Sequence, residues 1–498
     1  MSALLAASPI LLVLVLMLAA RLSAAQAGAA GLLLALVLAV GGISGSLGWA
    51  GVAGAILEGL FLSAAILWIL FAALSIHQIQ TDGGALALLR DALAGLTANR
   101  IILTLLVGWF FALFLEGVAG FGTPVALAAP ILAGLGIPPV QAVAIALLGH
   151  AGGVAFGAVG TPVIAQELLV ADSAAAIAAA TGPLNGLVAC VLMVAFALAA
   201  RSAGEGPAVG LWPTAGLAAA AFVVPMVAIA VFLGPELPTV IGALAGGAVY
   251  ALVATRRRGD AGGASVSWRA VAVAGAPYLA IVAVIVLTRM VAPLREVLSG
   301  IAIEWTLPGG FAGSFQPLFH PGSMLMLGLI AGVVVQRQRA ATVASGMAAA
   351  VRRLVPVAIA LVVMLSLSRV MLHAGMIDAL ARAAAAGTGG AWPLVAPAVG
   401  VLGSFVTGSA TTSNILFTNL QATTATDLGL PVILIVAAQG VGAAIGNIIS
   451  PLNVIAGAAT VGLAGREGAI MARTLPACLA CAAVAGAVVF ALTWAGGP

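Results

Sequence analysis

Apolar runs follow one another along the whole chain. Sixteen of them, separated by Arg, Pro or Gly-rich breaks, extend from residues 4–20 to residues 474–494. A transmembrane helix needs about 20 mostly apolar residues, so the runs predict membrane-spanning helices. The runs at 124–137 and 409–426 are short or polar, and we expect them to be broken or re-entrant. The pattern therefore predicts an all-α polytopic membrane protein with about 12–16 transmembrane segments.

The composition excludes a soluble protein. Only 6% of the residues are charged and 63% are apolar, whereas a soluble domain carries roughly 25% charged residues. All 18 basic residues are Arg, and the formal net charge of +4 is too small and too scattered for nucleic-acid binding. The bacterial inner membrane, crossed many times, is the expected location.

The positions of the Arg residues predict an orientation. If all sixteen runs cross the membrane, most Arg-containing loops fall on one side, which the positive-inside rule makes cytoplasmic. The N-terminus is then expected outside. Arg295 and Arg382 are the exceptions to this pattern.

Two stretches of the chain resemble each other. One begins at Gly120 and the other at Gly408; each opens with small polar residues, turns at a G-[IL]-P sequence and closes on [TS]-P. Nine spans separate the copies, and because nine is odd the copies are expected to be inverted. We therefore expect a first membrane repeat at 1–200, linking helices with a cytoplasmic Arg loop at 201–269, and a second repeat at 270–498.

The openings of these stretches have the composition to break a helix within the membrane. GVAGFGTP at 117–124 and FVTGSATTSN at 405–414 combine Gly, Pro and small hydroxyl side chains. Interrupted helices at matching positions of inverted repeats indicate a secondary transporter's binding site. Free amides at a broken helix's N-terminus suit a carboxylate. The alternative is ordinary kinked packing of helices through small residues.

Few ionisable groups lie inside apolar runs. Glu116 abuts the first break, where burial disfavours the charged form and makes it a candidate proton carrier; an interfacial position is the alternative. His150 lies mid-helix and could relay a proton or simply pack. We expect Arg369 to snorkel outward, with pairing to a substrate carboxylate as the alternative. Glu58 fits a buried role and an exposed rim equally well.

The longest motifs resemble those of the bacterial L-lactate permease family, which includes glycolate permeases. FLEGVAGFGTPVALAAPILAGLGIPP with VAFGAVGTPV lies in the first half. SFVTGSATTSNILFTNLQATTATDLGL and ISPLNVIAGAATVGLAGRE lie in the second. The resemblance implies inward transport of a 2-hydroxy-monocarboxylate (L-lactate, D-lactate or glycolate) with a proton.

Three positions depart from the pattern of that family. The family usually has Asp where this chain has Ala410, Lys where it has Asn447, and Asn where it has His150. An acid and a base lost together suggest a charge pair replaced as a unit.

On this interpretation Glu116, with His150, carries the proton, and polar side chains and backbone at the breaks bind the substrate. The expected substrate-binding residues are Gly120, Phe121, Gly122, Thr123, Gly408, Ser409, Thr411, Thr412, Ser413, Asn414, Gln439, Asn447, Ser450 and Asn453.

Several alternatives stay open. A sodium-coupled carrier of another small organic anion would use the carbonyls and hydroxyls at 408–414 and 447–453. A channel would conduct ions faster than a carrier. An enzyme is not expected, because the four His and three Cys residues are dispersed without a metal or nucleophile motif. We expect no cofactor and no catalytic or metal site, and the oligomeric state stays open, with a homodimer as one option.

Overall fold

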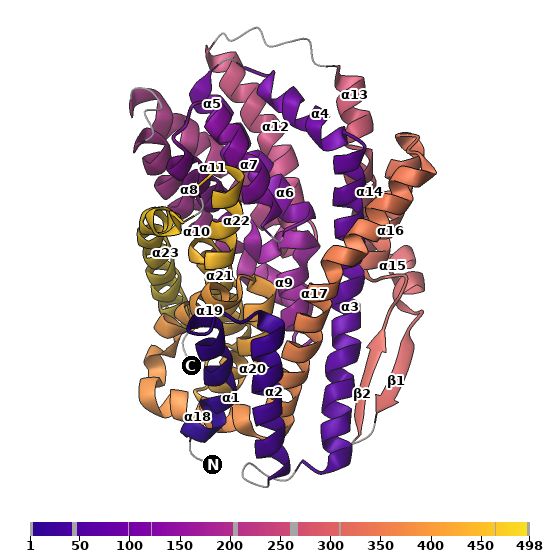
Figure 1. Ribbon diagram of the computed structural model, residues 1–498, viewed down its shortest axis with the longest axis vertical. Coiled ribbons are helices and arrows are strands. Elements are labelled where there is room, and N and C mark those ends of the chain that lie inside the picture. Colours follow the sequence, from indigo (N-terminus) through magenta and orange to yellow (C-terminus); the bar gives the residue numbers. More distant parts are fainter. Residues whose placement is uncertain are drawn as a thin grey trace.

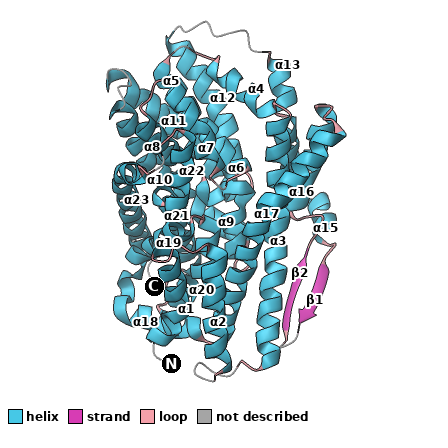
Figure 2. Ribbon diagram, in the orientation of Figure 1, coloured by secondary structure: helices cyan, strands magenta, loops and turns pink. Residues whose placement is uncertain are grey.

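The computed structural model describes residues 3–41, 47–97, 99–120, 122–202, 208–258, 267–307, 310–463 and 465–495. Within these residues eight helices are long and apolar enough to cross a membrane, or ten if each of two bent helix pairs counts as one span. Five further apolar helices are 10–17 residues long. The fold is an all-α polytopic membrane protein with interrupted helices, as predicted (Figure 2).

Two long helices form one flank of the molecule. α3 (Trp49–Asp82) and α17 (Ala340–His373) lie side by side along most of their length (Figure 1). The first two helices of the chain, α1 (Ala3–Leu18) and α2 (Ala24–Val40), pack near them. A short amphipathic helix, α4 (Ala85–Ala94), follows α3.

The first predicted break is the tip of a re-entrant hairpin. The descending arm comprises α5 (Arg100–Leu105), the π-helical segment η1 (Leu106–Phe111) and α6 (Ala112–Val118), and the returning arm is α7 (Thr123–Gly134). α7 packs back along both α6 and η1, so the chain reverses at the break. Gly120 and Gly122 have φ of +61° and +76°, a conformation that glycine adopts without steric cost.

A bent span follows this hairpin. α8 (Pro139–Ala151), the short η2 turn (Val154–Phe156) and α9 (Gly157–Glu167) bend by 55°. Three consecutive residues, Ala158 to Gly160, lie in the left-handed region, with φ of 42°, 55° and 78°. Left-handed backbone is uncommon for Ala and a genuine outlier for a β-branched residue such as Val159.

Several elements lie between the first interrupted span and the second hairpin, in addition to α17. They are α10 (Ala174–Ser202), α11 (Ala208–Phe232), α12 (Pro238–Arg258), α13 (Trp268–Ala274), α14 (Ala276–Met290), α15 (Ala292–Ser299), β1 (Ile303–Leu307), β2 (Phe311–Phe315), α16 (Pro321–Val335), α18 (Met376–Thr388) and η3 (Gly389–Ala391). The apolar pattern did not predict the two strands. They form an antiparallel hairpin against α3, where Trp305 stacks on Phe61 with ring centroids 4.9 Å apart.

The second repeat has the same construction. α19 (Trp392–Thr407) and α20 (Ala410–Asp427) form a hairpin with its tip at Gly408, where φ is +73°. Ser413 Oγ donates a hydrogen bond to the Gly400 carbonyl at 2.9 Å, and Gln421 bonds the Ala396 carbonyl at 2.9 Å, which fixes the antiparallel register. An interrupted span, α21 (Val432–Gly446), η4 (Asn447–Ile449) and α22 (Pro451–Thr460), precedes the final α23 (Glu467–Ala495).

The two repeats exchange contacts reciprocally. α7 of the first hairpin packs on α22 of the second interrupted span, and α20 of the second hairpin packs on α9 of the first. The break regions do the same, because α8 meets η4 while α21 meets η2. A two-fold relation produces such pairing. In Figure 1, α7 lies above the middle of the molecule and α20 below it, so the hairpins enter from opposite sides.

Candidate functional site

Both hairpin tips and both interrupted spans border one small cavity of about 40 Å³. The first repeat contributes part of the lining; these residues are Glu116, Gly120, Gly122, Val154, Gly157, Ala158 and Pro162. The second repeat contributes the rest, which are Gly408, Ser409, Ala410, Thr411, Asn447 and Asn453. The breaks predicted from sequence motifs about 290 residues apart therefore lie together, as the repeat pattern and helix chemistry indicated.

Four helices begin at this cavity. α7 starts after Gly122, α20 after Ser409 and α22 after Ser450, and the regular part of α9 starts after the left-handed residues Ala158 to Gly160. A helix N-terminus presents unpaired amides and a partial positive charge. The Ser409 hydroxyl caps α20 by accepting from the Thr412 amide at 3.2 Å, while α7, α9 and α22 have no side-chain cap. These uncapped amides are hydrogen-bond donors of the kind that binds an anion.

One carboxyl faces this ring of helix ends. Glu116 lies in the last turn of the descending arm and is 6% exposed. A β-carbon added at Gly120 would lie 3.5 Å from Glu116 Oε1, and one added at Gly157 would collide with the same oxygen. Two glycines from different elements thus make the space that the carboxyl occupies. Among the described lining residues Glu116 is the one ionisable side chain.

Asparagines connect the second interrupted span to both tips. Asn453 Nδ2 donates to Asn447 Oδ1, to the Asn447 carbonyl at 3.3 Å and to the Gly408 carbonyl at 3.5 Å. On its other side, a β-carbon added at Gly122 would lie 3.4 Å from Asn453 Oδ1. Asn453 therefore spans the gap between the two tips.

His150 lies directly behind this layer. It is 1% exposed, and its Nδ1 is 3.1 Å from the Ala146 carbonyl. Its ring also lies close to the Asn447 side chain. The side-chain amide of Asn447 thus separates the cavity from a second titratable group, His150. Ala410 and Asn447, the two positions that depart together from the family pattern, both line the cavity.

The other predicted site residues lie outside the lining. Thr123 and Ser450 flank it at the starts of α7 and α22, and Thr412 is one residue beyond the lining of α20. Asn414 bonds the carbonyl of the lining residue Pro162 at 3.0 Å, which ties α20 to α9. Phe121 lies outside the described residues.

Ser413 and Gln439 belong to a polar network within the second repeat. Gln439 Nε2 donates to Ser413 Oγ at 3.2 Å and Gln439 Oε1 accepts from Gln421 at 3.0 Å. With Ser413 bonded to the Gly400 carbonyl, the network joins α19, α20 and α21. These side chains shape the hairpin behind the cavity.

Three structural supports of the break were missed in the sequence. Asn185 of α10 bonds the Gly152 carbonyl at 2.7 Å, and Thr239 of α12 bonds the Gly153 carbonyl at 2.8 Å. Gln166 bonds the Val436 carbonyl at 2.8 Å and so joins the two interrupted spans. Asn185 and Thr239 are polar residues within apolar runs, the one sequence feature that could have identified them.

Arg369 does not snorkel outward, contrary to the expectation from the sequence. It is 7% exposed, donates to the Leu168 carbonyl at the end of α9, and lies 3.7 Å from Glu58 Oε1. Glu58 Oε2 also contacts His373 Nε2 at 2.9 Å. Since a buried charge is costly without partners, this cluster holds Arg369 inside and links α3 and α17 to the first interrupted span.

Comparison with known proteins relates the chain to bacterial permeases. The family model for L-lactate permease matches residues 2–312 and 307–495. An L-lactate permease of Streptococcus iniae is 30% identical over 375 residues, covering 73% of this chain and 78% of that protein. The glycolate permease GlcA of Escherichia coli (strain K12) is 28% identical over 541 residues, covering 98% and 95%.

A solved structure has a weaker likeness. The YdaH transporter of Alcanivorax borkumensis aligns with a TM-score of 0.47 and 16% identity over 89% of this chain and 88% of that chain. The family model covers almost the whole sequence, and the described helices are those of a multi-pass protein of the bacterial inner membrane. The chain belongs to the L-lactate permease family.

Proposed function

We propose that this protein imports a small 2-hydroxy-monocarboxylate, L-lactate, D-lactate or glycolate, by proton symport. The observation that carries the proposal is the meeting of four helix N-termini and one carboxyl at a single cavity between two inverted repeats. The names of the relatives, L-lactate permease and glycolate permease, support this substrate class.

The helix ends are suited to a carboxylate. Backbone amides at the starts of α20 and α22 would bind its oxygens. Thr411 and Asn453 offer a hydroxyl and an amide to the 2-hydroxyl group. No Arg or Lys lies among the described lining residues, so the anion would be held by dipoles and hydrogen bonds.

Glu116 gives a reason for proton coupling. A carboxylate substrate and an ionised Glu116 in the same low-dielectric cavity would repel each other strongly. Protonation of Glu116 removes that repulsion, so the anion and the proton bind together. The complex then moves with the charge of the anion and proton cancelled, which avoids about 2.3 kcal/mol per 100 mV for an anion moving inward.

His150 extends this scheme to a relay. Its imidazole lies close to Asn447, which lines the cavity, and is therefore one residue behind the cavity wall. A ring in that position can exchange a proton with the cavity through the intervening amide or through water. In this role His150 loads and unloads the site and leaves binding of the substrate to the hairpin tips.

The cavity must open to admit the substrate. A volume of about 40 Å³ accommodates water, which needs about 10–15 Å³ per site, but it is too small for a three-carbon acid. The Asn453 bridge between the tips is the contact that has to break. We infer that this is a closed arrangement and that the tips separate on one side at a time.

Uptake into proteoliposomes tests the proposal. Labelled L-lactate and glycolate should accumulate when the outside is acidic, with or without sodium, and other short 2-hydroxy acids should compete. Accumulation driven by a sodium gradient at equal pH would instead support the sodium-coupled alternative. Ion conduction in planar bilayers would contradict a carrier. Light scattering of the purified protein would decide whether it forms a homodimer.

A further inference from the structure

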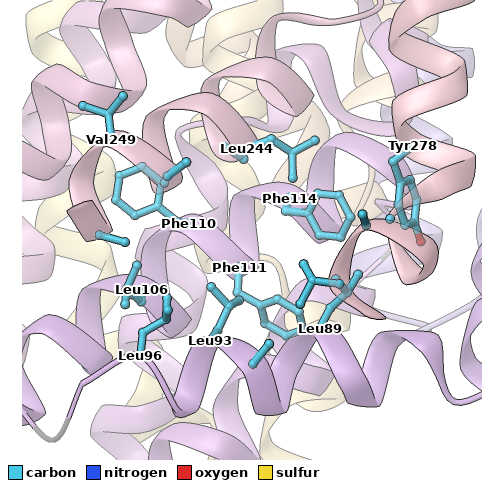
Figure 3. Close-up of a pocket in the computed structure, with 18 of the residues that line it drawn as sticks. Leu89, Leu93, Leu96, Leu106, Phe110, Phe111, Phe114, Leu244, Val249 and Tyr278 are labelled. Atoms are coloured by element: carbon cyan, nitrogen blue, oxygen red, sulfur yellow. The ribbon is translucent and has the colours of Figure 1, made fainter. Parts of the chain in front are cut away.

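A second and much larger cavity lies away from the polar site. Its volume is about 720 Å³, and it is bordered by α4, η1 with α6, α12, and α13 with α14 (Figure 3). Its walls are almost entirely aliphatic and aromatic, with Leu93, Phe111, Phe114 and Leu244 directed into it. Such a surface excludes a small carboxylate and does not hold water stably.

The elements at the opening of the cavity have the features of segments that lie at a membrane–water interface. Leu89 and Leu93 of α4 line the cavity, while Arg90 and Asp91 of the same helix are exposed and paired at 2.8 Å. An amphipathic helix of this kind lies in the plane of the membrane interface. Trp268 also lines the cavity and is 68% exposed, as interfacial Trp residues are.

A positive charge lies beside the interfacial Trp. Arg269 follows Trp268 and is exposed. α4 and α13 lie together at one end of the molecule in Figure 1. Arg residues beside an interfacial helix attract anionic headgroups.

We propose that this cavity binds one anionic phospholipid, with an acyl chain among Phe110, Phe111 and Phe114 and the phosphate at Arg269. The apolar lining fits the chain, and the basic, Trp-flanked mouth fits the headgroup. The three phenylalanines belong to the arm of the first hairpin that also carries Glu116. The bound lipid therefore packs against the element that positions the carboxyl.

A pair of substitutions on one helix tests the site. Ala248 and Ala245 are both exposed on α12, but Ala248 lines the cavity and Ala245 does not. Purified protein is incubated in detergent with palmitoyl-oleoyl-phosphatidylglycerol and the matching phosphatidylethanolamine, and bound lipid is counted by native mass spectrometry. We expect one phosphatidylglycerol on the wild type and on Ala245→Trp, and about tenfold lower occupancy on Ala248→Trp.

A second filling variant and a charge variant complete the test. Ala272→Phe fills the cavity from α13 and should reproduce the loss if Ala248→Trp folds poorly by size-exclusion chromatography. Arg269→Gln should abolish the preference for phosphatidylglycerol, whereas Arg201→Gln, at the exposed end of α10, should keep it. If both Ala248→Trp and Ala272→Phe still bind lipid as fully as the wild type, the cavity is not the lipid site. Equal binding of the two lipids by the wild type would overturn the anionic headgroup, and a lipid-free dimer would assign the cavity to a second copy.

Discussion

The two repeats are similar in backbone and different in chemistry. The first hairpin and span bring a carboxyl, glycines and the left-handed residue Ala158 to the cavity. The second bring a hydroxyl pair, Ser409 and Thr411, and the amides of Asn447 and Asn453. The symmetric fold thus holds an asymmetric site. We propose that the first repeat carries the proton and the second binds the substrate, and substitutions on the two sides should separate these roles.

Glu116→Gln should have the largest effect. One pH unit is equivalent to about 1.36 kcal/mol, so one coupled proton sustains about tenfold accumulation of lactate. The amide cannot carry that proton, and accumulation in proteoliposomes should fall to equilibrium. Exchange of internal for external lactate should continue, because the neutral side chain resembles the protonated form.

The control for this substitution is Glu296→Gln, at an exposed position on α15. It should accumulate lactate as the wild type does. Normal accumulation by Glu116→Gln would assign the proton to another group, with His150 as the next residue to test.

Gly157→Ala should have the next largest effect. Gly157 has φ of −66° and ψ of 160°, which alanine adopts without strain. The added methyl group would collide with Glu116 Oε1, so the carboxyl must leave its position. We expect initial uptake rates to fall by about tenfold or more, since misplaced groups at a site are costly. Gly134→Ala, where the added group meets open space, should transport normally.

Thr411→Val tests the second repeat and should act on substrate affinity alone. Loss of one neutral hydrogen bond, worth about 1 kcal/mol, should raise the KM for lactate about fivefold. The pH dependence of uptake should not change, because the proton site lies in the first repeat. Thr412→Val, at the neighbouring position outside the lining, is the matched control. An altered pH profile in Thr411→Val would contradict the division of roles.

Ala158→Gly should have the smallest effect, and it should stabilise the protein instead of impairing it. Ala158 has φ of 42°, and a left-handed non-glycine residue costs about 1–2 kcal/mol. Glycine should therefore raise the free energy of unfolding by up to about 1 kcal/mol, measured by thermal unfolding in detergent. Ala144→Gly, within the regular helix α8, should lower it by about 1 kcal/mol. A loss of stability at both positions would show that Ala158 is not strained.

Much of the fold and the centre of the site could be predicted from the sequence. Gly, Pro and hydroxyl residues within apolar runs identified both tips, because local composition decides where a helix can break in the membrane. Glu116 stood out because an ionisable residue inside an apolar run is rare. The repeat pattern then predicted that the two breaks are related.

The remaining features depend on tertiary packing. Hydropathy could not distinguish the re-entrant arm at 100–118 from a crossing helix, since both are apolar over the same length. Which polar residues face the cavity depends on helix rotation, so Ser413 and Gln439 could not be separated from Thr411 and Asn453. The roles of Asn185 and Thr239 depend on carbonyls freed by a break elsewhere in the chain.

The central claim is that the two hairpin tips together form the substrate site beside Glu116. A cryo-electron microscopy structure determined with saturating L-lactate at acidic pH tests it most directly. We predict separated tips, with the carboxylate at the starts of α20 and α22 and the hydroxyl near Thr411 and Asn453. Density for lactate at any other place, with the tips still joined through Asn453, would contradict the account.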